Sequence, residues 1–198
     1  MNSQKSTTKQ TLKKNRKIAE TGIFLALFLG LAYAFAYIPN LEYITVIAFL
    51  SGLLLGWKRG LFVALIGETI FSIANPFGSS LAFPPTLIAQ LLSYAMIALT
   101  GSLFRLFIPK LLKTKPILAA FYFGLTGLLL TSIYNIITTL AFTIPSGFTL
   151  EQTIASVIGG IPFYLINMIA NTVSFSVLIT LILRYVSKQY PHYLEKNK

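Results

Sequence analysis

The sequence is poor in the side chains that most enzymes use for catalysis. Its 198 residues include no cysteine, no aspartate and a single histidine, His192, in a polar tail where no chemical role is expected. Without cysteine the chain has no disulfide, no thiolate nucleophile and no thiolate metal ligand. The five acidic residues are all glutamates and lie far apart, so no local carboxylate pair is available for acid and base catalysis. We therefore predict that the chain is not an enzyme and uses neither a metal nor a cofactor.

Charged residues are also scarce, at 11%, whereas 55% of the residues are hydrophobic and the mean hydropathy is +0.74. Such a chain cannot cover a water-soluble globule with polar side chains, so the composition predicts an integral membrane protein in contact with the lipid bilayer. The net charge of +11 would also suit nucleic-acid binding, but that function needs basic residues gathered on one polar surface. Here they stand between apolar segments, which argues against nucleic acid as a partner.

The apolar segments predict an all-α bundle of six transmembrane helices. The expected helices cover residues 18–36, 43–56, 61–74, 85–108, 117–144 and 153–185. They form one transmembrane domain, 18–186, between a basic, unstructured tail at 1–17 and a second tail at 187–198. The segment Trp57-Lys58-Arg59-Gly60 is expected to be the turn between the second and third helices, and the lysine-rich stretch 110–116 to be a loop.

The basic residues are distributed on one side of this predicted bundle. All 16 lysines and arginines fall in the amino-terminal tail, the second loop, the region around the fourth loop and the carboxy-terminal end. The first, third and fifth loops contain none. Because short cytoplasmic loops are enriched in lysine and arginine, we expect a multi-pass protein of the plasma membrane with both termini in the cytoplasm.

Polar and aromatic side chains gather at the predicted outer ends of the helices. Amide groups beside aromatic rings suit a small polar or heteroaromatic ligand. The alternative is structural, because tyrosines form interfacial belts and asparagines link membrane helices by hydrogen bonds. For the set as a whole we favour a substrate site made of Asn40, Glu42, Tyr43, Asn75, Phe77, Ser79, Gln90, Tyr94, Tyr134, Asn135, Tyr164, Asn167 and Asn171.

Two further glutamates lie in or near the predicted helices. Glu68 stands well inside the third helix without a basic residue in the apolar part of that helix. It is therefore protonated, hydrogen-bonded to another helix or facing a cavity. We favour a structural polar contact over proton coupling. Glu20, close to Arg16 and Lys17, is expected to form a local ion pair.

The first helix carries a stripe of small residues. Gly22, Ala26, Gly30 and Ala34 recur every four residues and therefore share one helical face. Such a stripe lets another helix approach closely. That helix could belong to the same bundle or to a partner protein, and the sequence leaves both open.

These features together resemble a known family, the substrate-binding S components of energy-coupling factor (ECF) transporters, which are prokaryotic ABC importers. The resemblance covers the six-helix layout, the basic amino end, the small-residue first helix, the Pro39-Asn40-Leu41-Glu42 loop and the segment GLLLGWKRG at 52–60. In that family an Ala-xxx-Ala motif on the first helix docks on a transmembrane T component. Here the stripe at Gly22, Ala26, Gly30 and Ala34 occupies the matching place.

The resemblance implies a protein of a prokaryotic cell membrane that captures a small molecule from outside. It implies vitamin or micronutrient uptake together with a T component and two cytoplasmic ATPases, but it does not identify the substrate. Two other functions stay open. One is a self-sufficient secondary transporter or small channel that uses Glu68, and the other is a membrane enzyme or assembly factor, for which we find no catalytic constellation.

Overall fold

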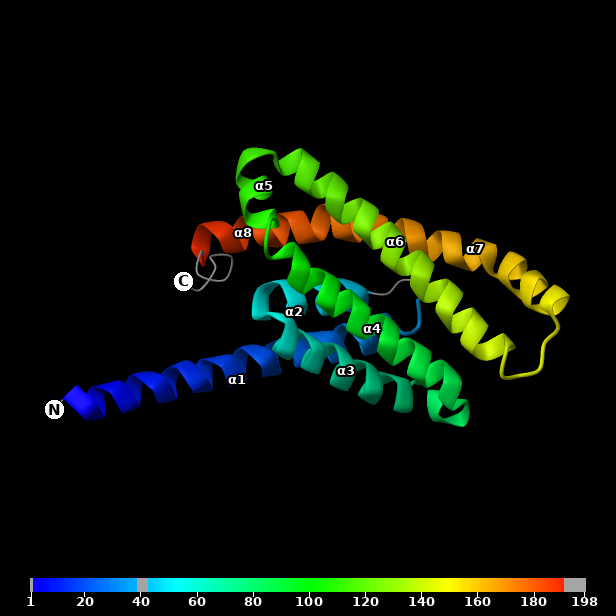
Figure 1. Cartoon of the computed structure of the whole chain (residues 1–198), viewed down its shortest axis with the longest axis horizontal. Helices are drawn as coiled ribbons and strands as arrows, with labels where there is room; N and C mark the ends of the chain where they lie inside the picture. The colour runs from blue at the N-terminus through cyan, green and yellow to red at the C-terminus, as the bar shows by residue number, and fades with distance from the viewer. Residues whose placement is uncertain (1, 39–42, 191–198) are drawn as a thin grey trace.

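The computed structural model is built from helices throughout the part of the chain that it describes, residues 2–38 and 43–190, with side chains described from residue 10 onward except at 109. Figure 1 shows how these helices are arranged. They are α1 (Asn2–Phe35), α2 (Ile44–Leu55), α3 (Trp57–Ile73), the 3-10 turn η1 (Ser80–Ala82), α4 (Pro84–Phe104), α5 (Ile108–Thr114), α6 (Pro116–Thr143), α7 (Leu150–Ser174), the π-helical turn η2 (Phe175–Ile179) and α8 (Thr180–Gln189). The prediction of an all-α fold is confirmed.

Among the described residues, four helical stretches are long and apolar enough to cross a membrane. They are Gln10–Phe35, Pro84–Phe104, Pro116–Thr143 and Leu150–Gln189. The last runs through the π-helical turn without a break. These stretches fit a multi-pass membrane protein, since a helix needs about 20 apolar residues to cross the hydrocarbon core.

The short helix α2 forms the centre of the bundle. All of its 12 residues are buried, and at about 1.5 Å per residue it is roughly 18 Å long. Its Phe49 side chain meets three aromatic rings from other helices, with centroids 5.3 Å from Phe104, 6.1 Å from Phe123 and 5.1 Å from Phe175. Helices α1, α3, α4 and α6 therefore pack around an apolar element that they shield.

Glycines allow α2, α3 and α4 to pack with their backbones almost in contact. A Cβ atom added to Gly52 would lie 1.8 Å from the carbonyl oxygen of Ala98, and one added to Gly101 would lie 2.0 Å from that of Phe49. A Cβ on Gly60 would meet the Gly52 backbone at 2.5 Å. No side chain fits at such distances, so these three positions require glycine.

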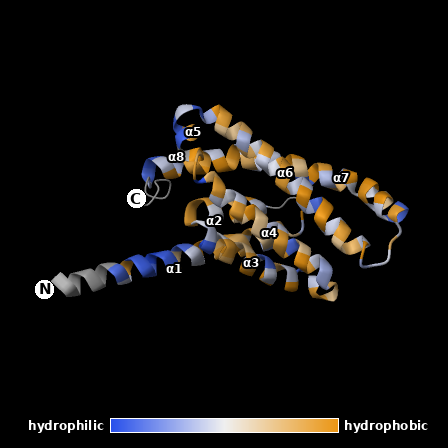
Figure 2. Cartoon of the chain, in the orientation of Figure 1, coloured by the Kyte–Doolittle hydropathy of each residue, from blue (hydrophilic) through white to orange (hydrophobic). Residues whose placement is uncertain are grey.

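The start of α1 and the end of α8 lie at the same end of the molecule (Figure 1). The amino-terminal half of α1, the α2–α3 turn, α5 and α8 are found there, and we call it the basic end. The segment between α3 and α4 and the connection between α6 and α7 lie at the opposite end, which we call the far end. Figure 2 shows hydrophilic residues concentrated in α1, α5 and α8 at the basic end.

The amino-terminal segment differs from its prediction. Residues 2–17 were expected to be unstructured, but α1 is continuous from Asn2 to Phe35. This segment has no proline or glycine to stop a helix that extends from the apolar half. An ion pair between Arg16 and Glu20, one turn apart at 3.2 Å, adds to it.

Helix boundaries were also wrong around the other basic segments. The residues expected to form the second turn, Trp57 to Gly60, are the first turn of α3. The reversal is made by Gly56 alone, with φ +87°, a backbone conformation open to glycine. Helix α4 ends at Phe104 rather than at 108, and the predicted loop 110–116 contains most of the short helix α5. The charged residues indicated that these segments reach the surface of the protein. They did not indicate whether the backbone there is helix or loop.

Candidate functional site

The residues predicted to bind a substrate fall into three groups that the fold places between helices or at the far end. Asn40 and Glu42 lie outside the described residues. The remaining residues occupy a polar group between α3 and α4, a polar seam between α6 and α7, and the loops of the far end.

The polar group between α3 and α4 is built around Glu68. Its carboxyl group is buried, with 2% of the residue exposed, and Oε1 accepts a hydrogen bond from Ser72 Oγ at 2.7 Å. Ser72 Oγ also lies 3.2 Å from the side-chain oxygen of Gln90 on α4. A hydroxyl has one hydrogen, so both contacts are satisfied when Gln90 turns its amide nitrogen toward Ser72. Glu68 is thus linked to α4 through Ser72, as expected for a structural polar contact.

Tyr94 lies one turn beyond Gln90 and is a core residue in this conformation. It is 1% exposed, and its ring meets Phe28 of α1 at 5.7 Å and Tyr134 of α6 at 5.8 Å, both edge to face. Phe28 is itself fully buried. Three helices therefore meet at one aromatic stack, and Tyr94 does not belong to an interfacial belt.

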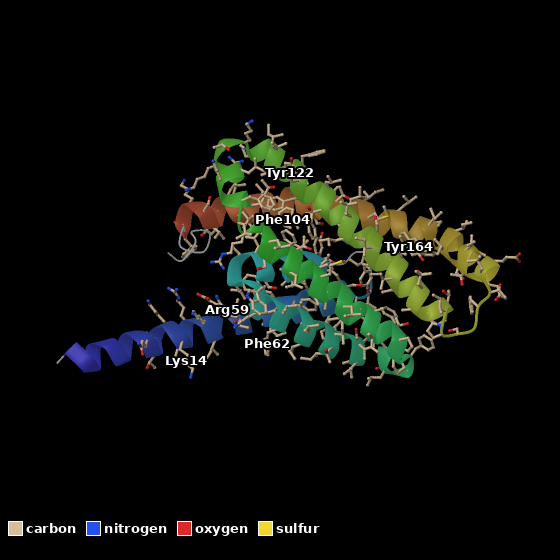
Figure 3. All side chains as sticks on the ribbon, viewed as in Figure 1. Lys14, Arg59, Phe62, Phe104, Tyr122 and Tyr164 are labelled. Carbon is tan, nitrogen blue, oxygen red and sulfur yellow. The ribbon has the colours of Figure 1, made fainter. Side chains whose placement is uncertain are left out.

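The polar seam between α6 and α7 contains the remaining amides. Asn171 donates a hydrogen bond from Nδ2 to Asn167 Oδ1 at 2.7 Å. Both residues are on α7, so this bond does not join two helices. The connection between helices comes from Tyr164, whose hydroxyl is hydrogen-bonded to that of Thr139 on α6. Figure 3 labels Tyr164 beside this pair of helices.

Two polar atoms on α6 are buried without a hydrogen-bond partner among the described residues. They are Nδ2 of Asn135, a residue 7% exposed, and Oγ1 of Thr131, one turn earlier and 2% exposed. Leaving such an atom unpaired costs about 1–3 kcal/mol. An unpaired donor beside the seam therefore has hydrogen-bonding capacity that a bound molecule could use.

At the far end, aromatic rings from different connections meet in pairs. Tyr37, after α1, packs on Phe77 between α3 and η1 with ring centroids 5.4 Å apart, and Phe83 packs on Phe142 at 5.3 Å. The polar residues predicted here form hydrogen bonds within their own loop. Asn75 Oδ1 accepts from the backbone of Phe77 at 2.9 Å, and Ser79 Oγ accepts from that of Leu81 at 3.2 Å. Tyr43 packs on Phe35 in the same region, at 4.7 Å.

Sequence reasoning missed Phe28, Ser72, Thr131 and Thr139 as members of this site. A signal existed for three of them. Ser72 follows Glu68 by four residues, and Thr131, Asn135 and Thr139 are each four apart, so they share helical faces with residues already named. Phe28 carried no such signal because only the packing of α1 against α3 and α4 brings it to Tyr94.

The small-residue stripe on α1 is not covered by any other described part of the chain. Gly22, Ala26, Gly30 and Ala34 are all exposed, and a Cβ atom added to either glycine would meet nothing within 4 Å. Of the two predicted uses of the stripe, packing inside the same bundle is excluded for this conformation. The face is free to meet lipid or another protein.

These groups supply amides, hydroxyls and aromatic rings, while the His, Asp, Glu and Cys side chains of the described residues form no cluster able to hold a metal ion. Comparison with models of known protein families finds no match to this chain, and comparisons with curated proteins and with solved structures find none either.

Proposed function

We propose that this chain is the substrate-binding membrane subunit, or S component, of an ECF-type ABC importer. It crosses a prokaryotic cell membrane six times with the basic end and both termini in the cytoplasm. It captures a small molecule, a vitamin or related micronutrient, at the far end. The observation that carries the proposal is the buried Nδ2 of Asn135 on α6, which is unpaired among the described residues, while α7, the helix packed against α6, carries the amides of Asn167 and Asn171.

The ligand that this site favours is neutral or weakly charged and rich in hydrogen-bonding groups. The seam offers amides and hydroxyls, and Tyr134 and Tyr164 add aromatic faces. Buried hydrogen-bonding groups discriminate strongly against molecules that leave them unpaired. Binding of this kind needs no covalent chemistry, in keeping with an uptake subunit.

The exposed stripe on α1 supports the second half of the proposal, association with a T component. Gly22, Ala26, Gly30 and Ala34 present a smooth face that another transmembrane helix can approach closely. ATP hydrolysis takes place on two cytoplasmic ATPases in this scheme.

Copurification tests the proposal. The tagged chain, extracted from its own cells in mild detergent, should bring down one transmembrane protein of the T type and two ATPase subunits, identified by sequencing. Gly30→Leu fills the stripe and should reduce their recovery at least about tenfold, whereas ligand binding stays unchanged. Gly159→Leu is the matched control, because a Cβ at Gly159 on α7 also meets nothing within 4 Å. Recovery of the chain alone from intact membranes would contradict the proposal.

A second candidate function is a self-sufficient transporter that uses Glu68. The observation in its favour is a carboxyl group buried inside α3, since ionisable groups at such depths often mark ion or proton pathways. Purified chain in liposomes without any ATPase would then take up substrate, and Glu68→Gln would abolish uptake. The S-component proposal expects no concentrative uptake by the chain alone and a Glu68→Gln protein that still binds ligand, because glutamine keeps an oxygen for Ser72.

A further inference from the structure

A groove between α1 and α3 at the basic end has no part in the small-molecule site. Its volume is about 650 Å³, within the range of roughly 300–1,000 Å³ typical of ligand pockets. The α1 wall is formed by one helical face that includes Lys13, Lys14, Lys17 and Ile18, and the α3 wall by Arg59 and Phe62. Figure 3 labels Lys14, Arg59 and Phe62 around it.

The charged part of the groove is strongly positive. Lys13, Lys14 and Lys17 are all exposed. Lys17 follows Lys13 by four residues and Lys14 by three, so each pair is adjacent on the surface of α1, and all three line the groove. Arg59 is fixed in place, because its guanidinium donates to Glu20 Oε2 at 2.8 Å and to the backbone oxygen of Leu55 at 3.2 Å. Glu20 also pairs with Arg16. The groove lining itself includes four cations and no carboxylate, which leaves the groove with an excess of positive charge.

The other part of the groove is apolar and exposed. Ile18 is 62% exposed and Phe62 is 51% exposed, while Gly22 leaves open space beside them. Trp57, 55% exposed and under the ammonium group of Lys58 at 5.2 Å, stands at the start of α3. Tryptophan next to lysine is typical of the boundary between the hydrocarbon and the headgroups. The groove therefore runs from a headgroup-level basic surface onto a hydrocarbon-level apolar surface.

We propose that this groove binds a membrane phospholipid with an anionic headgroup, its phosphate on Lys13, Lys14, Lys17 and Arg59 and an acyl chain on Ile18 and Phe62. Charge and apolar surface are complementary to the two halves of such a lipid. Basic clusters at the cytoplasmic end of membrane helices attract anionic lipids. The bound lipid would contact α1 and α3 together at the level of the headgroups, a role separate from substrate capture.

Native mass spectrometry of the full chain in detergent tests this inference. The probes are dioleoylphosphatidylglycerol, dioleoylphosphatidylcholine and soluble glycerol 3-phosphate. We expect the anionic lipid to be retained at least about tenfold more strongly than the zwitterionic one at low salt. Equal retention of the two lipids would overturn the inference, and so would glycerol 3-phosphate binding as strongly as the anionic lipid.

Variants locate the site. The triple change Lys13→Gln, Lys14→Gln and Lys17→Gln should abolish the preference for the anionic lipid, and Phe62→Ser should weaken both lipids without changing their ratio. The control also removes three positive charges, by Lys58→Gln, Arg184→Gln and Lys188→Gln, at positions outside the groove lining, and should keep the preference. If the control triple loses it to the same extent, net charge rather than the groove accounts for the binding. Thermal unfolding of each variant checks that it is folded.

Discussion

Individual polar side chains in this chain differ in whether they already form a hydrogen bond with another described residue. The hydroxyl of Ser72 donates a hydrogen bond to Glu68, and the side-chain amide of Asn171 donates one to Asn167. Asn135 Nδ2 and Thr131 Oγ1 are buried without such a partner among the described residues. An unpaired buried donor destabilises the protein, and a bound molecule that accepts a hydrogen bond from it would relieve that cost.

Asn135→Leu separates these two roles. Leucine has a similar size and removes the unpaired amide, so the ligand-free variant should unfold at the same or a higher temperature than the parent. Its affinity for the ligand should fall about tenfold or more, since one to two hydrogen bonds are lost. Thermal unfolding and ligand titration in detergent measure both quantities.

Asn171→Leu is the matched comparison. It breaks a hydrogen bond that the protein itself makes, so it should lower the unfolding temperature as well as the affinity. If Asn135→Leu destabilises the ligand-free protein as much as Asn171→Leu does, the amide of Asn135 has a structural role instead.

Within the helices, glycine occurs in two opposite settings, one tightly packed and one open. Gly52, Gly60 and Gly101 let three backbones meet in the core, whereas Gly22 and Gly30 on α1 have open space around them. Spacing alone does not distinguish the two sets. The sequence indicated that α1 bears a small-residue face, but only the packing of α1 shows that this face is exposed.

A pair of alanine substitutions tests this difference. Alanine favours a helix over glycine by about 1 kcal/mol, so Gly30→Ala should leave stability unchanged or raise it slightly. Gly52→Ala has the same favourable effect on helix propensity, but it places a methyl group 1.8 Å from the Ala98 carbonyl oxygen. That clash should separate α2 from α4 and lower the unfolding temperature by several degrees or prevent folding. Equal stabilities of the two variants, measured by circular dichroism on heating, would contradict this packing.

For the whole molecule, composition and apolar segments were sufficient to predict an all-α chain, because hydropathy and chain breakers are local properties. The helical state of residues 2–17 and the helix α5 were missed, since charged residues are compatible with helix and loop alike. Gln90 and Tyr94 lie on one helix, as the expected helix 85–108 predicts. The neighbours of their side chains depend on how α4 is rotated about its axis relative to α3 and α1. The periodicity of the sequence does not determine that rotation.

The absence of cysteine allows a direct test of the proposed orientation. Ser146→Cys introduces a thiol in the exposed α6–α7 connection at the far end, and Gln189→Cys introduces one at the end of α8. On intact cells, a membrane-impermeant maleimide should label only the Ser146→Cys protein. After the cells are opened, both should be labelled. Labelling of Gln189→Cys on intact cells would contradict a cytoplasmic basic end.

The seam between α6 and α7 is the proposed binding site for a small molecule. Mass spectrometry of the protein purified from its own cells, first native and then denatured to release what is bound, tests this binding directly. We expect one small organic molecule in stoichiometric amount on the parent protein and much less on Asn135→Leu. A parent protein that carries no such molecule after growth with its nutrients, or equal occupancy of both proteins, would show that the seam does not bind it.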